Sequence, residues 1–394
     1  MTDPSQYRDP RNPGGPLIPR AEWDGAPHNR WTFQNVRQIV PTAGVWRGPG
    51  PVLPLGSALQ NLADLDFECD GKRQTIAEFL DTSFTDGFIV LHKGAVVTET
   101  YMNGMQPRTT HLSQSVAKSV VGTVAGILNG KGELDFAAPV THYLPELANT
   151  AYRGATVQQV MDMQSGVLFD ETYTSPDSHI AKVDAACGWK EPKPGWPDTM
   201  WKLITELTEF EAAHGESFRY RSIETDVIGF ILQRVSGLML PELVSRELWA
   251  PMGAEEDAYF TVDLGGYGLA DGGFNATLRD YARFAQLICG GGAAHGRQVV
   301  PWHFISDLPN GDHAKFGGDY RIVLPEGAYH NQFWIEEAGK PVVICRGVFG
   351  QLIYIDPEHD FVAVKLSTWP EFTHPRRTRT ALAAIRAIRS AVAG

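Results

Sequence analysis

The chain has 394 residues, of which 43% are hydrophobic and 20% charged, and its formal net charge is −12. This composition indicates a globular protein with a sizeable core, organised as two lobes or one large domain. The negative charge disfavours nucleic acids and anionic membranes as partners, and no stretch has the uninterrupted apolar length of a membrane span.

Metal and redox sites have no recognisable pattern in the sequence. The histidines are scattered and the four cysteines show no C-x-x-C spacing, so we expect no metal and no cofactor. Four cysteines in a chain of this length fit a reducing compartment. Met1–Asn12 has neither the apolar segment nor the cleavage site of a secretory signal. We therefore expect a cytoplasmic protein, either a monomer or a homodimer.

The first predicted elements are an arm, a hairpin and a buried helix. Residues 1–55 are rich in proline and glycine and have little periodicity, which predicts an extended arm on the surface. Two apolar segments, Phe88–Gly94 and Ala95–Tyr101, meet at a Lys-Gly turn and predict a β-hairpin. Ser115–Leu128 is apolar on nearly every face, which predicts a fully buried helix.

This helix begins with a Ser-x-x-Lys motif, Ser115-Val116-Ala117-Lys118. Residues three apart in a helix point the same way, so the two side chains lie together. A serine hydroxyl needs a base to become a nucleophile, and a lysine can be that base only if burial lowers its pKa. The motif alone also fits a helix capped by Ser113 or Ser115, with a lysine that reaches solvent.

The rest of the chain changes from a helical pattern to a strand pattern. Helices are predicted at Val157–Met163, Thr199–Ala213, Glu224–Val235 and Leu240–Leu248. Strands are predicted at Phe333–Ile335, Val342–Cys345, Gln351–Ile355 and Phe361–Leu366, followed by a terminal helix at Arg377–Val392. Strands therefore flank a helical insert.

A second motif, Gly215–Ser222, contains a tyrosine followed two places on by a serine, Tyr220 and Ser222. With Ser-x-x-Lys, it resembles the Tyr-x-Asn/Ser element of serine β-lactamase-like hydrolases, the group of class C β-lactamases, D-alanyl-D-alanine carboxypeptidases and esterases. Further segments resemble the landmarks of this family in the right order: Thr156–Gly166, Leu248–Gly253 and Asp271–Asp280.

The resemblance implies an α/β fold of the serine β-lactamase type. Its expected parts are a five-stranded antiparallel sheet, covered by N- and C-terminal helices, and an all-helical lobe beside it. In this chain the sheet lobe corresponds to residues 56–131 and 271–394, and the helical lobe to residues 132–270. The active site is expected between the lobes.

The resemblance also implies an acyl-enzyme mechanism. Ser115 is the expected nucleophile, and Lys118 and Tyr220 share the proton transfers, although the sequence does not assign which of them is the base. The backbone N–H groups of Ser115 and Val348 are the expected oxyanion hole.

One family element departs from its usual form. Where the family has Lys/His-Thr/Ser-Gly, this chain has Cys345-Arg346-Gly347. The usual anchor for the carboxylate of β-lactams is therefore missing, and alternation along a strand is expected to aim Cys345 and Arg346 at opposite faces. Gly347 is kept, at a position where a larger residue is expected to block the substrate.

Three segments resemble a subgroup of this family, the nylon-oligomer (6-aminohexanoate-dimer) hydrolases: Pro27–Trp31, Gly350–Pro357 and Val364–Pro370. The resemblance implies that Tyr173 contacts the scissile amide and that Asp184 meets the ammonium end of the substrate. It also makes Trp189 a wall for a methylene chain, and Asp271 stands where a histidine or asparagine assists. Asp184 also fits a solvated loop acid, and Trp189 also fits plain packing.

The expected function is therefore hydrolysis of small linear amides by a serine nucleophile. A short-chain carboxylesterase is the first alternative, because the same groups cleave esters more easily. A non-catalytic penicillin-binding-like protein is the second, and the intact set of Ser115, Lys118 and Tyr220 argues against it.

Overall fold

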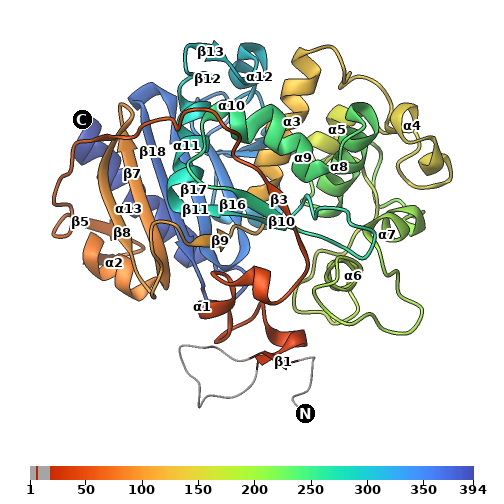
Figure 1. Ribbon diagram of the computed structural model, residues 1–394, viewed down its shortest axis with the longest axis horizontal. Coiled ribbons are helices and arrows are strands. Elements are labelled where there is room, and N and C mark those ends of the chain that lie inside the picture. The colour runs from red at the N-terminus through yellow and green to blue at the C-terminus, as the bar shows by residue number, and fades with distance from the viewer. Residues whose placement is uncertain (1–5, 8–17) are drawn as a thin grey trace.

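A computed structural model describes residues 6–7 and 18–394 and shows an α/β protein built on one large sheet (Figure 1). The sheet has eight strands, and all neighbours are antiparallel except the last pair. Their order is β14 (Ala328–His330), β15 (Phe333–Ile335), β16 (Val343–Gly347), β17 (Gln351–Asp356), β18 (Phe361–Ser367), β7 (Thr85–His92), β8 (Ala95–Tyr101) and β4 (Gly56–Ser57).

The expected α/β class is confirmed, but the expected count of five strands is wrong. Five strands, from β16 to β8, have five or more residues. Three shorter strands, β14, β15 and β4, add to the two edges. They pair with backbone groups that the edges of a five-stranded sheet would leave open.

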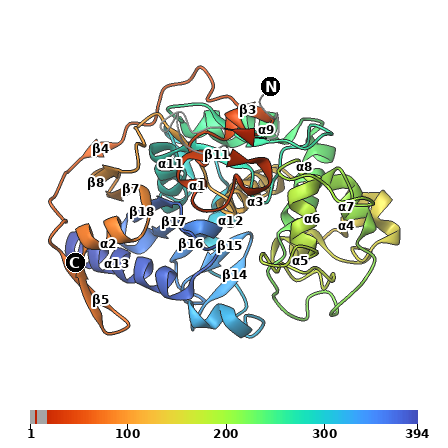
Figure 2. The same ribbon diagram turned by 90° about the horizontal axis from the view of Figure 1, so that it is seen from below.

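Both faces of the sheet are covered, which explains why four successive residues of β7, Phe88–Leu91, are all apolar and buried. Phe88 and Val90 face a core with α2 (Ile76–Thr82) and α13 (Pro375–Ala393). Ile89 and Leu91 face the larger core, which includes α3 (Val116–Gly130) and α11 (Leu278–Cys289). Figure 2 shows α2 and α13 together on one side of the sheet.

A helical region lies beside the sheet, with α3 between them (Figure 1). It contains α4 (Val140–Tyr143), α5 (Val157–Met161), α6 (His179–Ala186), α7 (Met200–Glu206) and α8 (Ile223–Ser236). Near the top of the molecule lie α9 (Leu240–Val244), a π-helical turn (Ser245–Trp249) and α10 (Ala250–Met252).

The helix predicted at 199–213 is shorter than expected. α7 ends at Glu206, and the residues that follow pair with another segment: Glu209 accepts a hydrogen bond from Leu168, and Phe210 forms a bridge with Val167. Residues 132–270 also contain β10 (Ala258–Thr261), which joins a second sheet in the order β3 (Thr42–Val45), β10, β11 (Phe274–Thr277), β9 (Thr110–Leu112). The lobe boundaries stay a prediction.

The expected surface arm is partly wrong. Residues 18–55 form short helices, including α1 (Asn29–Thr32), and β3. The side chains of Trp23 and Phe33 are fully buried. Arg30 donates to the buried carboxylate of Asp86 at 2.8 Å. Isolated aromatic residues between prolines and glycines have no periodicity, which is why the pattern suggested a surface segment. Residues 1–5 and 8–17, also part of that prediction, lie outside the described residues.

Within the described part of the chain, no single helix is long and apolar enough to cross a membrane. One bent pair, Ile223–Ser236 with Leu240–Met252, meets the requirement by length and composition only.

An ion-pair triad connects α5 with the edge of the large sheet. His330 lies 2.9 Å from Asp162 and 2.8 Å from Asp307, the last residue of α12 (Trp302–Asp307). Burial acts to lower the pKa of His330, but the hydrogen bonds to both carboxylates outweigh burial and raise this pKa to about 9. The hydrogen bond from His330 lowers the pKa of Asp307 to about 2.

We expect this triad to make stability depend on pH in the alkaline range. A histidine with a raised pKa stabilises the fold fully below its ordinary pKa near 6.5, and this stabilisation is lost as the pH rises through about 9. The free energy of unfolding of wild type minus that of His330→Gln should fall by about 3 kcal/mol between pH 6 and pH 10 in urea titrations. A difference that is constant over this range contradicts the assignment.

Candidate active site

Ser115 and Lys118 lie one turn apart at the start of α3. Ser115 is the residue before the helix, and its side chain makes no capping hydrogen bond. The ammonium of Lys118 donates to Ser115 Oγ at 3.0 Å and to the backbone carbonyl of Asp271 at 2.6 Å. The Lys118 side chain is 2% exposed. The alternative interpretation of the motif, a helix capped by Ser115 with a lysine that reaches solvent, therefore does not describe this site.

Tyr220 lies just before α8 and completes the cluster. Lys118 Nζ is 5.3 Å from the centre of its ring, which stacks on Trp334 at 5.3 Å. The pKa of Tyr220 is raised, because burial outweighs the charge of Lys118 and the hydrogen bonds with Ser115 and Lys118, which act to lower it. The three side chains expected to do the chemistry thus form one hydrogen-bonded cluster, in which Lys118 is buried and Ser115 and Tyr220 are partly buried.

The pKa of Lys118 is raised, not lowered as expected from burial. Burial acts to lower it, but the negative charges of Tyr220, Asp271 and Glu171 outweigh that effect. Lys118 therefore keeps its proton in the resting site and donates to Ser115. The sequence indicated the apolar helix around Lys118 but not the acids that converge on it from other segments.

Two of those acids were not identified from the sequence. Asp226 is fully buried on α8 and accepts a hydrogen bond from the backbone of Ala270, next to Asp271. Glu171 accepts from the backbone N–H of Ser222 at 2.9 Å and from the Tyr173 hydroxyl at 2.8 Å. The sequence does not single out Asp226, because it follows Glu224 and Thr225 in the first turn of α8.

Asp271 lies against Lys118 and beside the nucleophile. Its carboxylate is 4.0 Å from Lys118 Nζ, and one of its oxygens is buried without a partner among the described residues. Burial raises its pKa to about 6, although Lys118 acts to lower it. Asp271 also lines the cavity, so its carboxyl group, with a pKa of about 6, is part of the cavity wall.

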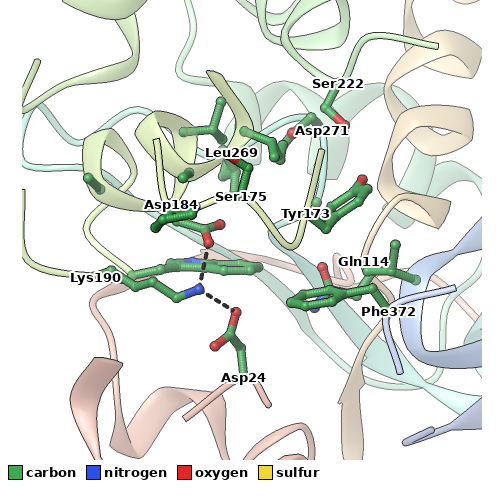
Figure 3. A pocket seen from close by; sticks show the side chains of 18 of the residues that line it. Asp24, Gln114, Tyr173, Ser175, Asp184, Lys190, Ser222, Leu269, Asp271 and Phe372 are labelled. Carbon is green, nitrogen blue, oxygen red and sulfur yellow. Dashed lines mark hydrogen bonds and ion pairs between the residues drawn. The ribbon is translucent and has the colours of Figure 1, made fainter. Parts of the chain in front are cut away.

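Ser115 lines a cavity of about 430 Å³. Figure 3 shows this cavity with ten of its lining residues labelled. This volume is typical of a small-molecule site. Its lining includes most of the residues expected to bind substrate: Ser115, Tyr173, Asp184, Trp189, Asp271 and Val348. Trp189 packs edge-on against Trp23 at 5.1 Å and donates to Thr261 at 3.1 Å, so it is both packed and part of the wall.

Gly347 does not line this cavity, and its position has a different explanation. A Cβ at Gly347 would lie 2.4 Å from the backbone oxygen of Ser113. Glycine therefore allows β16 to approach the segment before the nucleophile. Cys345 is fully buried in the core that contains α3, while the Arg346 guanidinium lies 4.7 Å from the ring of Trp334, in the other core.

Asp184 does not face the cavity as a free carboxylate. It lies 2.7 Å from the ammonium of Lys190, which is also 3.4 Å from Asp24 (Figure 3). Burial raises the pKa of Asp24 to about 6, and although Lys190 lowers it, the charge of Asp184 adds to the rise. Asp24 comes from the segment predicted to be a surface arm, so its position at the cavity was not predicted.

Residues 73–388 match the family described as Beta-lactamase. The chain belongs to this family. The predicted serine β-lactamase-like hydrolase is therefore confirmed at the level of the family.

The chain is similar in sequence or in structure to proteins named as hydrolases. A 6-aminohexanoate-dimer hydrolase of Paenarthrobacter ureafaciens is 38% identical over 356 residues, which are 89% of this chain and 88% of the relative. A structure from Bacillus anthracis, provisionally named as a 6-aminohexanoate-dimer hydrolase, is 29% identical with a TM-score of 0.86, covering 95% of this chain and 96% of that one. A family VIII carboxylesterase shares the fold, at 17% identity and a TM-score of 0.60, covering 79% and 95% of the two chains.

Proposed function

We propose that this hydrolase cleaves amide bonds in small linear substrates of the 6-aminohexanoate-dimer type. One observation carries the proposal: Ser115, hydrogen-bonded to a buried Lys118 beside Tyr220, opens into a cavity with carboxylates at its far end. The name of the 38% identical relative supports the same substrate class.

In the proposed mechanism, Ser115 Oγ attacks the carbonyl carbon of the amide. Because Lys118 keeps its proton, the proposed base is Tyr220 in its phenolate form, which takes the proton of Ser115 Oγ. Burial raises the pKa of Tyr220, and the ammonium of Lys118 acts against this rise and favours the phenolate. The proton then passes to the leaving nitrogen as the C–N bond breaks. Water hydrolyses the resulting ester at Ser115 by the same path in reverse.

The other site residues have proposed roles around this step. The backbone N–H groups of Ser115 and Val348 hold the oxyanion. Tyr173, oriented by Glu171, contacts the scissile amide, and Trp189 lies along the methylene chain. Asp184 attracts the amino end, Asp271 holds Lys118, and Gly347 keeps β16 close to the nucleophile.

We further propose a cytoplasmic location, because all four cysteines are free. The proposed partner is a small amide or ester substrate. The proposed oligomeric state is a monomer or a homodimer. In the cell this activity would contribute to the degradation of nylon oligomers.

The substrate profile tests the proposal. We expect hydrolysis of the 6-aminohexanoate dimer and of p-nitrophenyl butyrate, and a kcat/KM for nitrocefin at least about 100-fold below that for the ester. The reason is that Cys345 and Arg346 replace the usual anchor for the β-lactam carboxylate. Arg346 is held over Trp334 instead.

Chromatography of the released 6-aminohexanoate and absorbance of p-nitrophenol measure the two rates. An enzyme that cleaves the butyrate ester but not the dimer is a carboxylesterase, and the proposed substrate class is then wrong. A nitrocefin rate equal to the ester rate contradicts the reasoning about Cys345 and Arg346.

A further inference from the structure

The far end of the cavity carries an ion-pair cluster, Asp24, Asp184 and Lys190, which we call the Asp–Lys–Asp cluster (Figure 3). It brings together two separate segments: the N-terminal region supplies Asp24, and α6 with the loop directly after it supplies Asp184 and Lys190. Lys190 Nζ is 2.7 Å from Asp184 and 3.4 Å from Asp24. The side chains of Lys190, Asp184 and Asp24 are 29%, 22% and 7% exposed, and all three residues line the cavity.

We propose that Asp24 and Asp184 form a receptor for a primary ammonium group, and that Lys190 is a built-in occupant which competes with the substrate for it. The inference rests on the proposed function and deepens it. It adds two residues, Asp24 and Lys190, that set the specificity for substrates whose acyl part has a free amino end.

The charge of the cluster supports this proposal. Two carboxylates and one ammonium leave one negative charge in a mostly buried place, where an uncompensated charge is unfavourable. The charge of Asp184 acts to raise the pKa of Asp24, although burial is the larger cause of the rise to about 6. A cation that enters from the cavity supplies the missing charge.

Neighbouring charges do not cancel the excess. The other charged side chains that line this end of the cavity, Glu191 and Lys193, are engaged elsewhere: Glu191 lies 3.5 Å from Arg20, and Lys193 lies 2.6 Å from Asp177. The net charge of the receptor is therefore set by Asp24, Asp184 and Lys190.

The ammonium of Lys190 is able to move away from the two carboxylates. Its backbone N–H is fixed to the carbonyl of Asp184, but its ammonium sits on a flexible four-carbon stem that is almost a third exposed. A primary ammonium of a substrate has the same three donors as Lys190 and fits the same two carboxylates. Trp189, the residue before Lys190, lines the same cavity as Ser115.

Two esters that differ in one charge test the proposal: p-nitrophenyl 6-aminohexanoate, which is cationic, and p-nitrophenyl hexanoate, which is neutral. The measured quantity is the ratio of their kcat/KM values, cationic over neutral. Lys190→Met should raise this ratio about tenfold, and Asp24→Asn should lower it about tenfold. The double variant restores the net charge, so its ratio should lie within about threefold of wild type.

The control is Lys202→Met, which removes the same charge from an exposed pair with Asp198 outside the cavity. Its ratio should stay at the wild-type value. The proposal is overturned if Lys190→Met lowers the ratio or leaves it unchanged, or if Lys202→Met raises it as much as Lys190→Met does.

A binding measurement separates this proposal from the proposed function. If wild type cleaves neither ester, the proposed function is wrong, and calorimetric titration with n-hexylammonium chloride decides the inference without any turnover. Tighter binding to Lys190→Met and weaker binding to Asp24→Asn support the receptor. Equal binding to both variants and wild type overturns it.

Discussion

Replacing Ser115 with alanine should lower kcat/KM for esters and amides by roughly four to six orders of magnitude. The Ser115 hydroxyl is the atom that forms the acyl bond, and it accepts a hydrogen bond from the ammonium of Lys118 at 3.0 Å. Turnover of p-nitrophenyl butyrate by wild type and Ser115→Ala, purified separately, measures the effect.

The fold should survive this substitution. Ser115 makes no capping hydrogen bond, so its loss removes little from α3, and the melting temperature should change by only a few degrees. Residual activity above about one per cent of wild type in a folded Ser115→Ala protein contradicts its role as nucleophile.

Lys118→Met should lower kcat by about 10²–10⁴-fold. In wild type, the ammonium of Lys118 stabilises the phenolate form of Tyr220 and holds the backbone of Asp271. Without it, Tyr220 loses the charge that lowers its pKa and becomes a poorer source of a phenolate. Stopped-flow or steady-state rates with the butyrate ester measure the loss.

A pH profile separates this catalytic role from a structural one. Because the charge of Lys118 lowers the pKa of Tyr220, its removal should raise the pKa of the tyrosine, and the residual activity should increase up to a higher pH than in wild type. A Lys118→Met protein that keeps the wild-type profile and rate shows that Lys118 only supports the packing of α3.

The parts of the fold with strong local patterns were predictable. The hairpin at Phe88–Tyr101 appears as β7 and β8, and Lys93 and Gly94 adopt the positive φ values of its turn. The buried helix appears as α3, in which every side chain from Val116 to Leu128 is buried. Here the local pattern and the tertiary environment favour the same structure.

The parts that depend on contacts between distant segments were not predictable. The N-terminal region becomes structured because Trp23 packs on Trp189 and Arg30 binds Asp86, and neither contact has a local signal. The same holds for Asp24, which reaches the cavity only because this region folds against the loop after α6.

The candidate site divides in the same way. Ser115 and Lys118 are neighbours on one helix, and the tyrosine motif placed Tyr220 with them by resemblance. The acids that raise the pKa of Lys118 come from separate loops and helices, so their combined effect depends on the fold. The ion-pair partner of Asp184 was equally unpredictable from the sequence, because Lys190 is six residues away and its side chain turns back across the loop.

The central claim, that Ser115 is an activated nucleophile at the base of the cavity, is tested most directly by intact-mass spectrometry with a fluorophosphonate. The account predicts one adduct per chain, located by peptide mapping to the peptide that contains Ser115, and no adduct in Ser115→Ala. An unmodified wild-type protein, or an adduct on a different residue, would contradict it.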